Sequence, residues 1–257
     1  MDNCDLKGCG ILVTRAVHQA RTLAQQIEAC HGRAVLLPAI DIQPLQDQGN
    51  AVALLQQPWD WMIFVSPNAV RYTLQMEVLN DRQQAAGIGA VGESTAKLLQ
   101  QAGLSVDLLP QQGYDSEGLL SLPELVHAQG KRVLIIRGKG GRPLLGDTLK
   151  ARGAKVSYAE VYQRVRPDIP VISLLQSWKQ DIQLVTTTSN EVLKNLVVML
   201  GEVGWSQLSQ TPLLVISERM QHEAQRLGFD KVIRASGADD QSLMAAICTW
   251  ADGNEPQ

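Results

Sequence analysis

The sequence has few of the residues that mark metal sites, disulfide frameworks or membrane segments. It contains 4 cysteines and 4 histidines in 257 residues. The cysteines form no Cys-x-x-Cys pair, and no histidine has a second histidine four residues away or a cysteine at ligand spacing, which disfavours a metal site. No apolar run approaches the ~20 residues that span a bilayer, and the first residues lack the pattern of a signal peptide. We therefore expect a cytoplasmic protein with reduced cysteines, no bound metal and no membrane association.

The sequence also lacks an excess of basic residues. Lys and Arg together number 23 against 26 for Asp and Glu, which gives a formal net charge of -3. Proteins that bind nucleic acids usually carry a strong basic excess, so no nucleic acid is expected as a partner. Hydrophobic residues make up 45% of the chain and charged residues 19%, a balance typical of a packed globular core. Because the net charge is slightly negative, a site for an anionic ligand must depend on a local group of basic residues and N–H donors.

Several motifs of nucleotide-binding proteins and hydrolases are missing. The segment 138–143, GKGGRP, fails the G-x-G-x-x-G spacing of dinucleotide sites, and no G-x-x-x-x-G-K-[ST] phosphate loop occurs. The segment 14–19, TRAVHQ, lacks the glycine of a flavodoxin-type phosphate loop, and no G-x-S-x-G motif of serine hydrolases is present. The sequence therefore predicts no cofactor.

The chain does contain a regular alternation of short apolar runs and helical patterns. Such alternation is typical of parallel sheets that helices cover on both faces, so the predicted fold class is α/β. The number of runs indicates two units of five strands each. The runs are 11–13, 35–37, 62–65, 88–91, 106–109, 133–136, 156–158, 184–185, 213–216 and 232–233.

Two further stretches, 40–43 and 159–163, alternate apolar and polar residues outside these strand–helix units. We expect them to pair as a narrow two-stranded ribbon, because prolines at their edges are typical of crossings between modules. The middle of the chain would then be inserted into a discontinuous outer module. The expected boundaries are 1–38 and 167–257 for the outer α/β module, 46–158 for the inserted α/β module, and 39–45 and 159–166 for the connecting ribbon.

Serines precede several of the predicted helices. Ser66 stands before Pro67, and Ser189 and Ser217 each stand just before a helical pattern. A serine in this place caps the helix by accepting a hydrogen bond from a backbone N–H of the first turn. Glycines mark three expected helix ends. They are Gly103, Gly153 and Gly228.

The residues that follow the apolar runs form the candidate site, because ligands of open parallel sheets bind beyond the carboxyl ends of the strands. They are mainly hydroxyls, glycines and arginines, which donate hydrogen bonds as a polycarboxylate ligand requires. Simpler roles are open to the same residues: the serines cap helices, and the arginines are ordinary surface side chains. The candidates are Thr14, Arg15, Ser66, Thr95, Arg137, Gly138, Arg142, Thr188, Ser189 and Arg219.

The turn at 137–142, RGKGGR, is the most distinctive of these segments. It lies between an apolar strand and a helical pattern. Backbone N–H groups and two guanidinium groups would meet there at one helix start, which suits an anionic ligand.

Three segments of the chain resemble one known family. They are 11–15, ILVTR, the run from Arg137 to Tyr162, and 214–219, LVISER. In order and spacing they are similar to the uroporphyrinogen-III synthases, and the likeness runs from Ile11 to about Trp250. The resemblance implies two flavodoxin-like parallel-sheet modules joined by a two-stranded ribbon, with the active site in the interdomain cleft.

The resemblance also implies an activity. Members of this family are lyases that cyclise linear hydroxymethylbilane to uroporphyrinogen III in the biosynthesis of heme and siroheme. The reaction loses water and inverts ring D through a spirocyclic intermediate, without cofactor or metal. For this chain the resemblance implies a cytoplasmic monomer whose partner is a small-molecule substrate, with transient contact with the preceding pathway enzyme.

The resemblance assigns roles to particular residues. Tyr162 stands at the family's Val-Tyr position and is implied as the acid that assists departure of the hydroxyl. The ten strand-end candidates named above are implied as contacts of the substrate and its carboxylates. Some relatives have threonines where Glu218, Arg219 and Met220 stand here, so we expect the contribution of the outer module to differ from theirs. Without the resemblance, Tyr162 reads as a half-buried aromatic residue, and the residues also permit a two-domain binding protein for a small anion.

Overall fold

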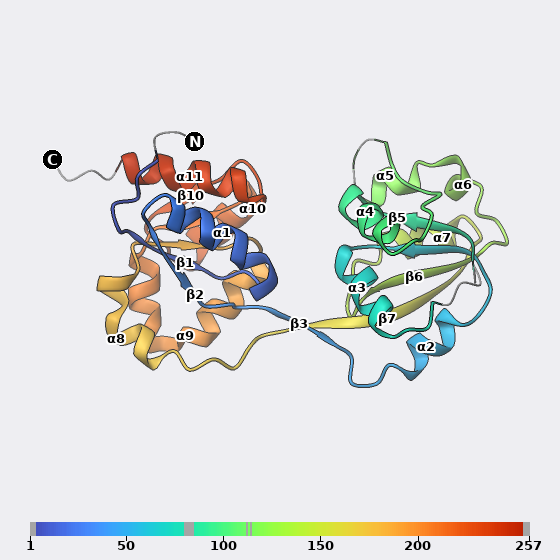
Figure 1. Ribbon diagram of the computed structural model, residues 1–257, viewed down its shortest axis with the longest axis horizontal. Helices are drawn as coiled ribbons and strands as arrows, with labels where there is room; N and C mark the ends of the chain where they lie inside the picture. The colour runs from blue at the N-terminus through green and yellow to red at the C-terminus, as the bar shows by residue number, and fades with distance from the viewer. Residues whose placement is uncertain (1–3, 80–84, 112, 114, 254–257) are drawn as a thin grey trace. The chain divides into compact units, whose positions relative to one another are not determined.

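The computed structural model describes residues 4–79, 85–111, 113 and 115–253. The chain divides into two compact units: unit 1 comprises Met1–Asp41 and Val165–Gln257, and unit 2 comprises Ile42–Arg164 (Figure 1). Each unit contains a five-stranded sheet. The predicted α/β class, with two mainly parallel sheets, is confirmed.

The sheet of unit 1 has the strand order β10-β9-β8-β1-β2, and its neighbouring strands are parallel. Hydrophobic side chains alternate between its two faces, because successive residues of a strand point to opposite sides. On β1, Ile11 and Val13 pack into one cluster and Leu12 into the other. The strands are β1 (Gly10–Val13), β2 (Arg33–Leu36), β8 (Leu184–Thr186), β9 (Leu213–Val215) and β10 (Val232–Arg234).

Helices cover both faces of this sheet. One cluster joins the sheet to α1 and α11, and the other joins it to α8, α9 and α10. Helix α9 has a kink at Gly201, whose φ of 62° lies in the left-handed region that favours glycine. The helices are α1 (Val17–Ala29), α8 (Ile172–Asp181), α9 (Asn190–Gln210), α10 (Glu218–Leu227) and α11 (Asp240–Asp252).

The sheet of unit 2 has the order β3-β7-β6-β4-β5. Strands β5, β4, β6 and β7 are parallel to their neighbours. Their side chains also form two clusters: Leu134 and Ile136 of β6 pack into one, and Val133 and Ile135 into the other. The strands are β3 (Asp41–Pro44), β4 (Trp59–Phe64), β5 (Ala85–Ala90), β6 (Arg132–Gly138) and β7 (Lys155–Val165).

Six helices cover the sheet of unit 2 in the described part of the chain. Helix α3 packs against the cluster that contains Leu134, and α7 against the cluster that contains Val133. The helices are α2 (Gly49–Leu55), α3 (Pro67–Gln75), α4 (Glu93–Gln101), α5 (Ser116–Leu120), α6 (Pro123–Val126) and α7 (Leu144–Ala151).

Two strand predictions require correction. The run 106–109 is not a strand: only Leu108 bridges to Gly89, and the fifth place in the sheet belongs to β3. The runs 156–158 and 159–163, predicted as separate elements, form the single strand β7. Alternation of apolar residues gave no sign of this continuity, because the same pattern serves a strand in a sheet and a strand in a ribbon.

The predicted helix caps are confirmed. The Ser66, Ser189 and Ser217 side chains accept backbone hydrogen bonds at the starts of α3, α9 and α10. Pro67 is the first residue of α3. Gly228 ends α10 with a left-handed φ of 96°.

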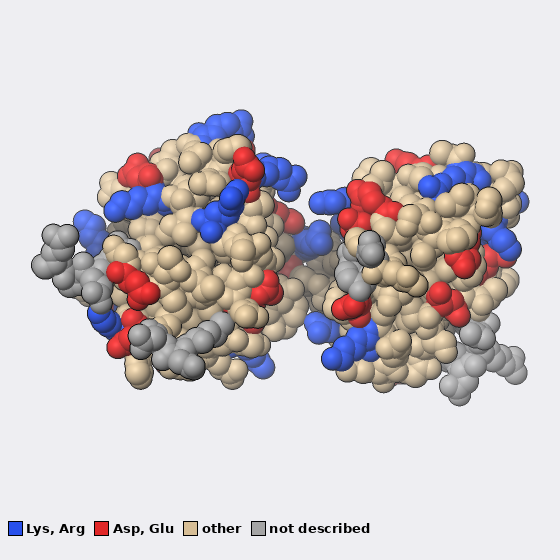
Figure 2. All heavy atoms as spheres, turned by 90° about the horizontal axis from the view of Figure 1, so that it is seen from above, with Lys and Arg blue, Asp and Glu red and all other residues tan. Residues whose placement is uncertain are grey.

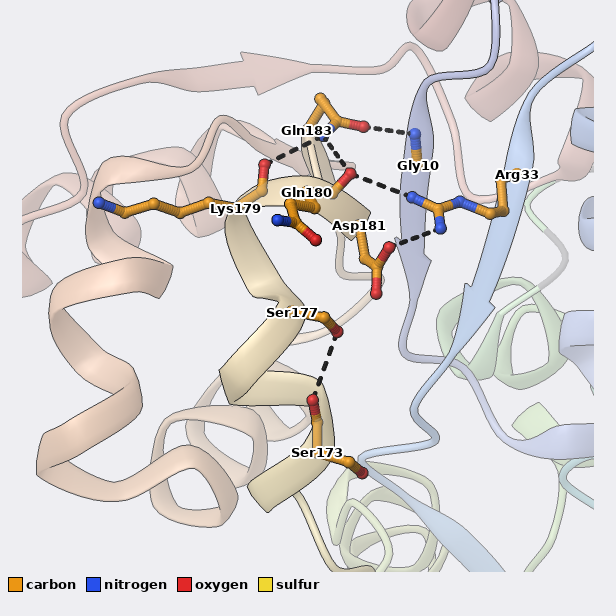
Figure 3. Close-up of polar contacts among 8 residues, drawn as sticks. All are labelled: Gly10, Arg33, Ser173, Ser177, Lys179, Gln180, Asp181 and Gln183. Atoms are coloured by element: carbon orange, nitrogen blue, oxygen red, sulfur yellow. Dashed lines mark hydrogen bonds and ion pairs between the residues drawn. The ribbon is translucent and has the colours of Figure 1, made fainter.

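The C-terminal end of α8 is fastened to the amino ends of β1 and β2 (Figure 3). Arg33 Nη1 donates to Asp181 Oδ1 at 2.6 Å, and Arg33 Nη2 donates to the Gln180 carbonyl oxygen at 3.1 Å. The Gly10 backbone N–H donates to Gln183 Oε1 at 2.6 Å. A Cβ atom on Gly10 would lie 1.7 Å from the Asp181 carbonyl oxygen, so only glycine permits this close approach.

A disulfide joins Cys4 to Cys248, 244 residues apart in the sequence, with the Cα atoms 5.5 Å apart. The expectation of four reduced cysteines is therefore wrong for this pair; Cys9 and Cys30 are unpaired. All four cysteines pack around the cluster that joins the sheet to α1 and α11. The spacing of the cysteines along the chain could not reveal this disulfide. Cys248 lies on α11, and only the packing of that helix brings it close to Cys4.

No helix in the described ranges combines the length and apolar character of a membrane span. Figure 2 shows basic and acidic side chains interspersed on the visible face of each unit. Neither unit therefore presents a field of one sign on that face, consistent with the net charge of -3.

Candidate functional site

Unit 2 brings Tyr162 and Ser66 together at the carboxyl edge of its sheet. Ser66 follows β4 and caps α3, and Tyr162 lies near the end of β7. The Ser66 Oγ and Tyr162 Oη atoms lie 3.2 Å apart, and Ser66 Oγ also accepts the Ala69 N–H at 3.1 Å. These two predicted site residues, 96 positions apart in sequence, therefore form one hydroxyl pair.

The Tyr162 ring is held on several sides. Only 2% of the residue is exposed, and its ring stacks on Tyr72 with the centroids 5.7 Å apart. A Cβ atom on Gly138 would meet the ring at 2.4 Å. The Lys139 backbone N–H donates to the Tyr162 carbonyl oxygen at 2.8 Å. The phenol is thus fixed beside the glycine-rich turn.

An irregularity in β7 decides which face of the sheet carries Tyr162. The register of β6 and β7 shifts between Arg137 and Gly138, so Arg137 pairs with Glu160 but Gly138 pairs with Tyr162. Strict alternation would put Tyr162 on the face of Tyr158. The shift instead lets Tyr162 pack into the same cluster as Val161.

Arg137 lies on the opposite face from Tyr162. Its guanidinium stands 4.0 Å from the centre of the Tyr158 ring, donates to Glu160 Oε1 at 3.1 Å and donates to the Gly141 carbonyl oxygen at 3.2 Å. Arg137 therefore holds the glycine-rich turn against β7. The sequence predicted this guanidinium at an anion site, and the structure shows it bonded to Glu160 and the Gly141 carbonyl oxygen.

Arg142, the other arginine of the turn, is exposed. Its side chain makes no hydrogen bond or ion pair with any residue that the structure describes. It lies two residues before the first turn of α7, whose start has no side-chain cap. The uncapped start of α7 and a guanidinium are thus the groups that an anion could meet here.

Thr95 lies in the first turn of α4, which follows β5, and is 2% exposed. Its backbone N–H donates to the Gly92 carbonyl oxygen at 3.0 Å. Since β5 is next to β4 in the sheet, Thr95 and Ser66 follow adjacent strands at the same edge.

Two predicted contacts in unit 1 are engaged within the protein. Thr14 is fully buried and donates its hydroxyl to the Thr186 carbonyl oxygen at 2.6 Å. Arg15, 8% exposed, forms an ion pair with Asp240 and donates to the Ala238 carbonyl oxygen. Both residues therefore join β1 to neighbouring elements, and an anion near Arg15 would have to compete with Asp240.

A cavity of about 480 Å³ lies beside Arg15. Its lining includes Thr188, Asp239 and Asp240. Two carboxylates in the wall repel an anionic ligand, so this cavity is not suited to a polycarboxylate.

Thr188, Ser189 and Arg219 follow strands of unit 1 at their carboxyl ends. Thr188 and Ser189 are partly exposed, and Arg219 is exposed in the first turn of α10. Beside them, Thr187 Oγ1 and Asn190 Oδ1 are buried without a hydrogen-bond partner among the described residues. These two were not predicted as contacts. Such orphaned acceptors are rare, and no sequence pattern distinguishes them from satisfied ones.

Within the described ranges, no three His, Cys, Asp or Glu side chains gather in a way that could hold a metal ion. Besides the carboxylates that pair with Arg15 and Arg137, the groups at the two strand edges are hydroxyls, backbone N–H groups and arginines. They can hold carboxylates and move a proton between oxygens.

Comparison with known proteins identifies the family of the chain. The family model for uroporphyrinogen-III synthase HemD matches residues 21–245. The uroporphyrinogen-III synthase of Escherichia coli (strain K12) is 33% identical over 246 residues, covering 92% of this chain and 99% of that protein. The enzyme of the same name from Synechococcus elongatus is 27% identical over 259 residues, covering 96% and 97% of the two chains.

Solved structures show the same fold. A mutant uroporphyrinogen III synthase from the extremely thermophilic bacterium Thermus thermophilus superposes with a TM-score of 0.63 at 16% identity, covering 96% of this chain and all of that one. The uroporphyrinogen-III synthetase of Helicobacter pylori 26695 gives a TM-score of 0.60 at 18% identity, covering 94% and 99%. With the family match over most of the sequence, this chain belongs to the uroporphyrinogen-III synthase family.

Proposed function

We propose that this chain converts linear hydroxymethylbilane to uroporphyrinogen III, and that Tyr162 is the acid of the reaction. The observation that carries the proposal is the fixed hydroxyl pair of Tyr162 and Ser66, 3.2 Å apart, at the carboxyl edge of a parallel sheet. Ligands of such sheets bind at that edge. Membership of the family supplies the substrate class.

The first step requires a proton. The hydroxyl of the hydroxymethyl group is a poor leaving group, and a proton from the Tyr162 phenol lets it depart as water. The bilane is left as an electron-deficient azafulvene. Because Tyr72 and Gly138 confine the Tyr162 ring, its phenol is held in one orientation before the substrate binds.

The second requirement is shape. An unaided bilane closes without inversion to the symmetric isomer. The enzyme must therefore hold the bilane in a conformation in which ring D is attacked at its substituted carbon. We assign this holding to groups that are accessible at the strand edges and bind carboxylates. In unit 2 these are Arg142 and the uncapped start of α7; in unit 1 they are Ser189 and Arg219. Thr95 is buried and Thr188 lines the cavity of Asp239 and Asp240, so neither is assigned to a carboxylate.

Arg137, Thr14 and Arg15 have a different role in this proposal. Their side chains are committed to Glu160, Thr186 and Asp240. We therefore assign them to holding the edges in shape rather than to the substrate. Gly138 acts through its missing side chain, which makes room for the Tyr162 ring.

We also infer that both units are flavodoxin-like modules. Read from its β2 end, the sheet of unit 1 has the order β2-β1-β8-β9-β10, which corresponds to the 2-1-3-4-5 order of that fold. Unit 2 repeats it with β5, β4, β6 and β7, and β3 takes the last place. Strand β3 and the end of β7 would then form the connecting ribbon between the two modules. We further propose that the protein is a cytoplasmic monomer.

The direct test is product analysis. Purified protein without added metal or nucleotide is incubated with freshly made hydroxymethylbilane, and the product is oxidised and separated into isomers. We expect mainly the type III isomer, against type I in a heat-inactivated control. A product that stays type I with protein in excess of substrate would favour the alternative, a two-domain protein that only binds anions.

A further inference from the structure

We propose that Ser66 is a positioning residue for Tyr162 rather than a substrate contact. In this arrangement Ser66 donates its hydroxyl proton to the Tyr162 oxygen and leaves the phenolic proton for the departing hydroxyl of the substrate. The inference rests on the proposed function and adds a specific role at the same site.

The hydrogen-bond inventory supports this assignment. The oxygens of Ser66 and Tyr162 carry one proton each, and a single bond of 3.2 Å joins them, so one proton remains for a ligand. The Ala69 N–H occupies one lone pair of Ser66 Oγ at 3.1 Å and fixes that oxygen at the start of α3. A phenol is a much stronger acid than an aliphatic alcohol. The arrangement with Ser66 as donor therefore presents the stronger acid to the ligand.

The surroundings of Tyr162 make Ser66 the group that orients its proton. The ring has no freedom to find another partner, because Gly138 and Tyr72 confine it. Ser66 is the one side chain among the described residues that bonds to the phenolic oxygen. Rotation of the phenolic O–H is thus controlled by a hydroxyl that α3 itself holds in place.

The proton balance closes within the reaction. Tyr162 gives its proton to the hydroxyl, the C–O bond breaks, and water leaves. The phenolate that remains accepts the Ser66 O–H, a charge-assisted bond that is stronger than the neutral one. Closure of the macrocycle releases the proton from the terminal carbon of ring D, and that proton restores the phenol. No outside acid, oxidant or cofactor is needed.

Three variants separate positioning from capping. Ser66→Gly removes the hydroxyl but weakens a helix start only slightly, whereas Ser66→Thr keeps both the donor and the cap. Asp115→Gly is the matched control, because Asp115 caps α5 of the same unit through a 2.7 Å bond to the Gly118 N–H and lies outside the proposed site. Circular dichroism and denaturant unfolding establish that each variant is folded.

The test is a double-mutant cycle in kcat and KM between Ser66→Gly and Tyr162→Phe. We expect Ser66→Gly to lower kcat roughly 10-fold with little change in KM, because it removes one hydrogen bond to a developing charge. The same substitution should change kcat less than about 2-fold when Tyr162→Phe is already present, because coupled residues are not additive. Ser66→Thr should restore turnover, and Asp115→Gly should leave it unchanged.

The outcomes are distinguishable. Equal losses in both backgrounds, or a loss confined to KM, would mean that Ser66 touches the substrate directly and would overturn the positioning role. Full turnover by Ser66→Gly would overturn it as well, while the proposed function would stand. Absence of type III product from the unmodified protein would overturn both.

Discussion

Gly138 and Tyr162 are paired across β6 and β7 at a distance that excludes any side chain: a Cβ atom on Gly138 would lie 2.4 Å from Cε2 of the Tyr162 ring. This contact explains why position 138 requires a glycine, although its φ lies outside the left-handed region. The ring occupies the space that any other residue would need. A glycine of the glycine-rich turn thus makes room for the ring of the proposed acid.

Gly138→Ala should therefore displace the Tyr162 ring. We expect a loss of about 1–3 kcal/mol in the free energy of unfolding, the usual cost of overpacking, together with a fall in kcat. Gly141→Ala is the control in the same turn, because its Cβ would meet the flexible Arg137 side chain at 3.2 Å. Urea unfolding and steady-state kinetics measure both variants. Equal effects of the two substitutions would contradict a specific clash with Tyr162.

Tyr162→Phe should lower kcat by roughly 10- to 1000-fold, the contribution of a positioned acid, while affinity for the product stays nearly unchanged. Tyr158→Phe is the matched control. It removes a phenol from the same strand, but on the face where the ring supports Arg137. Full turnover by Tyr162→Phe would show that catalysis rests on substrate shape and backbone donors alone.

Arg142→Ala should raise KM more than it lowers kcat. An exposed arginine that binds a carboxylate contributes about 1–3 kcal/mol, equivalent to roughly 5- to 150-fold in affinity. Arg226→Ala is a suitable comparison, because Arg226 lies in the last turn of α10, away from the carboxyl ends of the strands, and its removal changes the net charge equally. An unchanged KM for Arg142→Ala, or an equal rise for the two variants, would remove Arg142 from the substrate site.

Much of the local structure could be predicted from the sequence. The caps at Ser66, Ser189 and Ser217 depend on residues within one turn, so the signal and the structure lie together. The position of Ser66 at the carboxyl edge followed from the topology of parallel strands, although Tyr162 was expected in the connecting ribbon. The hydroxyl contact itself did not, since it needs the register shift that turns Tyr162 to that face.

Partners far apart in the sequence could not be predicted. Arg15 and Arg137 were expected to face a ligand because they follow strands. Their guanidinium groups instead meet Asp240 and Glu160, which the tertiary packing supplies. The run 106–109 was misassigned for a different reason: Asp107 and Leu108 bond to Ile88 of β5, but only Leu108 forms a bridge, to Gly89, so no strand develops.

The Cys4–Cys248 disulfide should stabilise unit 1. It closes a very long loop, and such a link typically adds about 2–5 kcal/mol to the free energy of unfolding. Cys248→Ser should lose that amount, whereas Cys9→Ser, which removes an unpaired cysteine, should lose much less. A reductant should destabilise the unmodified protein but not Cys248→Ser. A reductant effect of equal size in both would assign the loss to other thiols.

Asp60 should make part of the stability of unit 2 depend on pH. A hydrogen bond from the Arg132 backbone N–H, at 2.8 Å, and then the Lys131 ammonium hold the pKa of Asp60 below its ordinary value. A lowered folded-state pKa contributes stability above the unfolded pKa of about 3.9, and the contribution is lost as the pH falls through the folded pKa. Asp60→Asn should therefore be less stable than the unmodified protein at neutral pH, with the difference shrinking in acid.

We expect a neutral-pH difference of only about 1 kcal/mol for Asp60→Asn, because solvent screens a side chain that is partly exposed. Asp168→Asn is the control, since Asp168 is exposed and makes no hydrogen bond or ion pair within the described ranges. Urea unfolding at several pH values between neutral and about pH 3 measures both. A difference for Asp60→Asn that stays constant with pH would contradict the charge-dependent bond.

The division of the chain also bears on the order in which the protein takes shape during synthesis. Unit 2 is one continuous segment, so all of it has been made once Arg164 has been added. Unit 1 has to wait: β1 pairs with β2 from the first segment, but its other neighbour, β8, is made only after the whole of unit 2. During that interval β1 has an unpaired edge, and its apolar residues lack half of their cover. The N-terminal segment is thus the part of the nascent chain most exposed to misassembly.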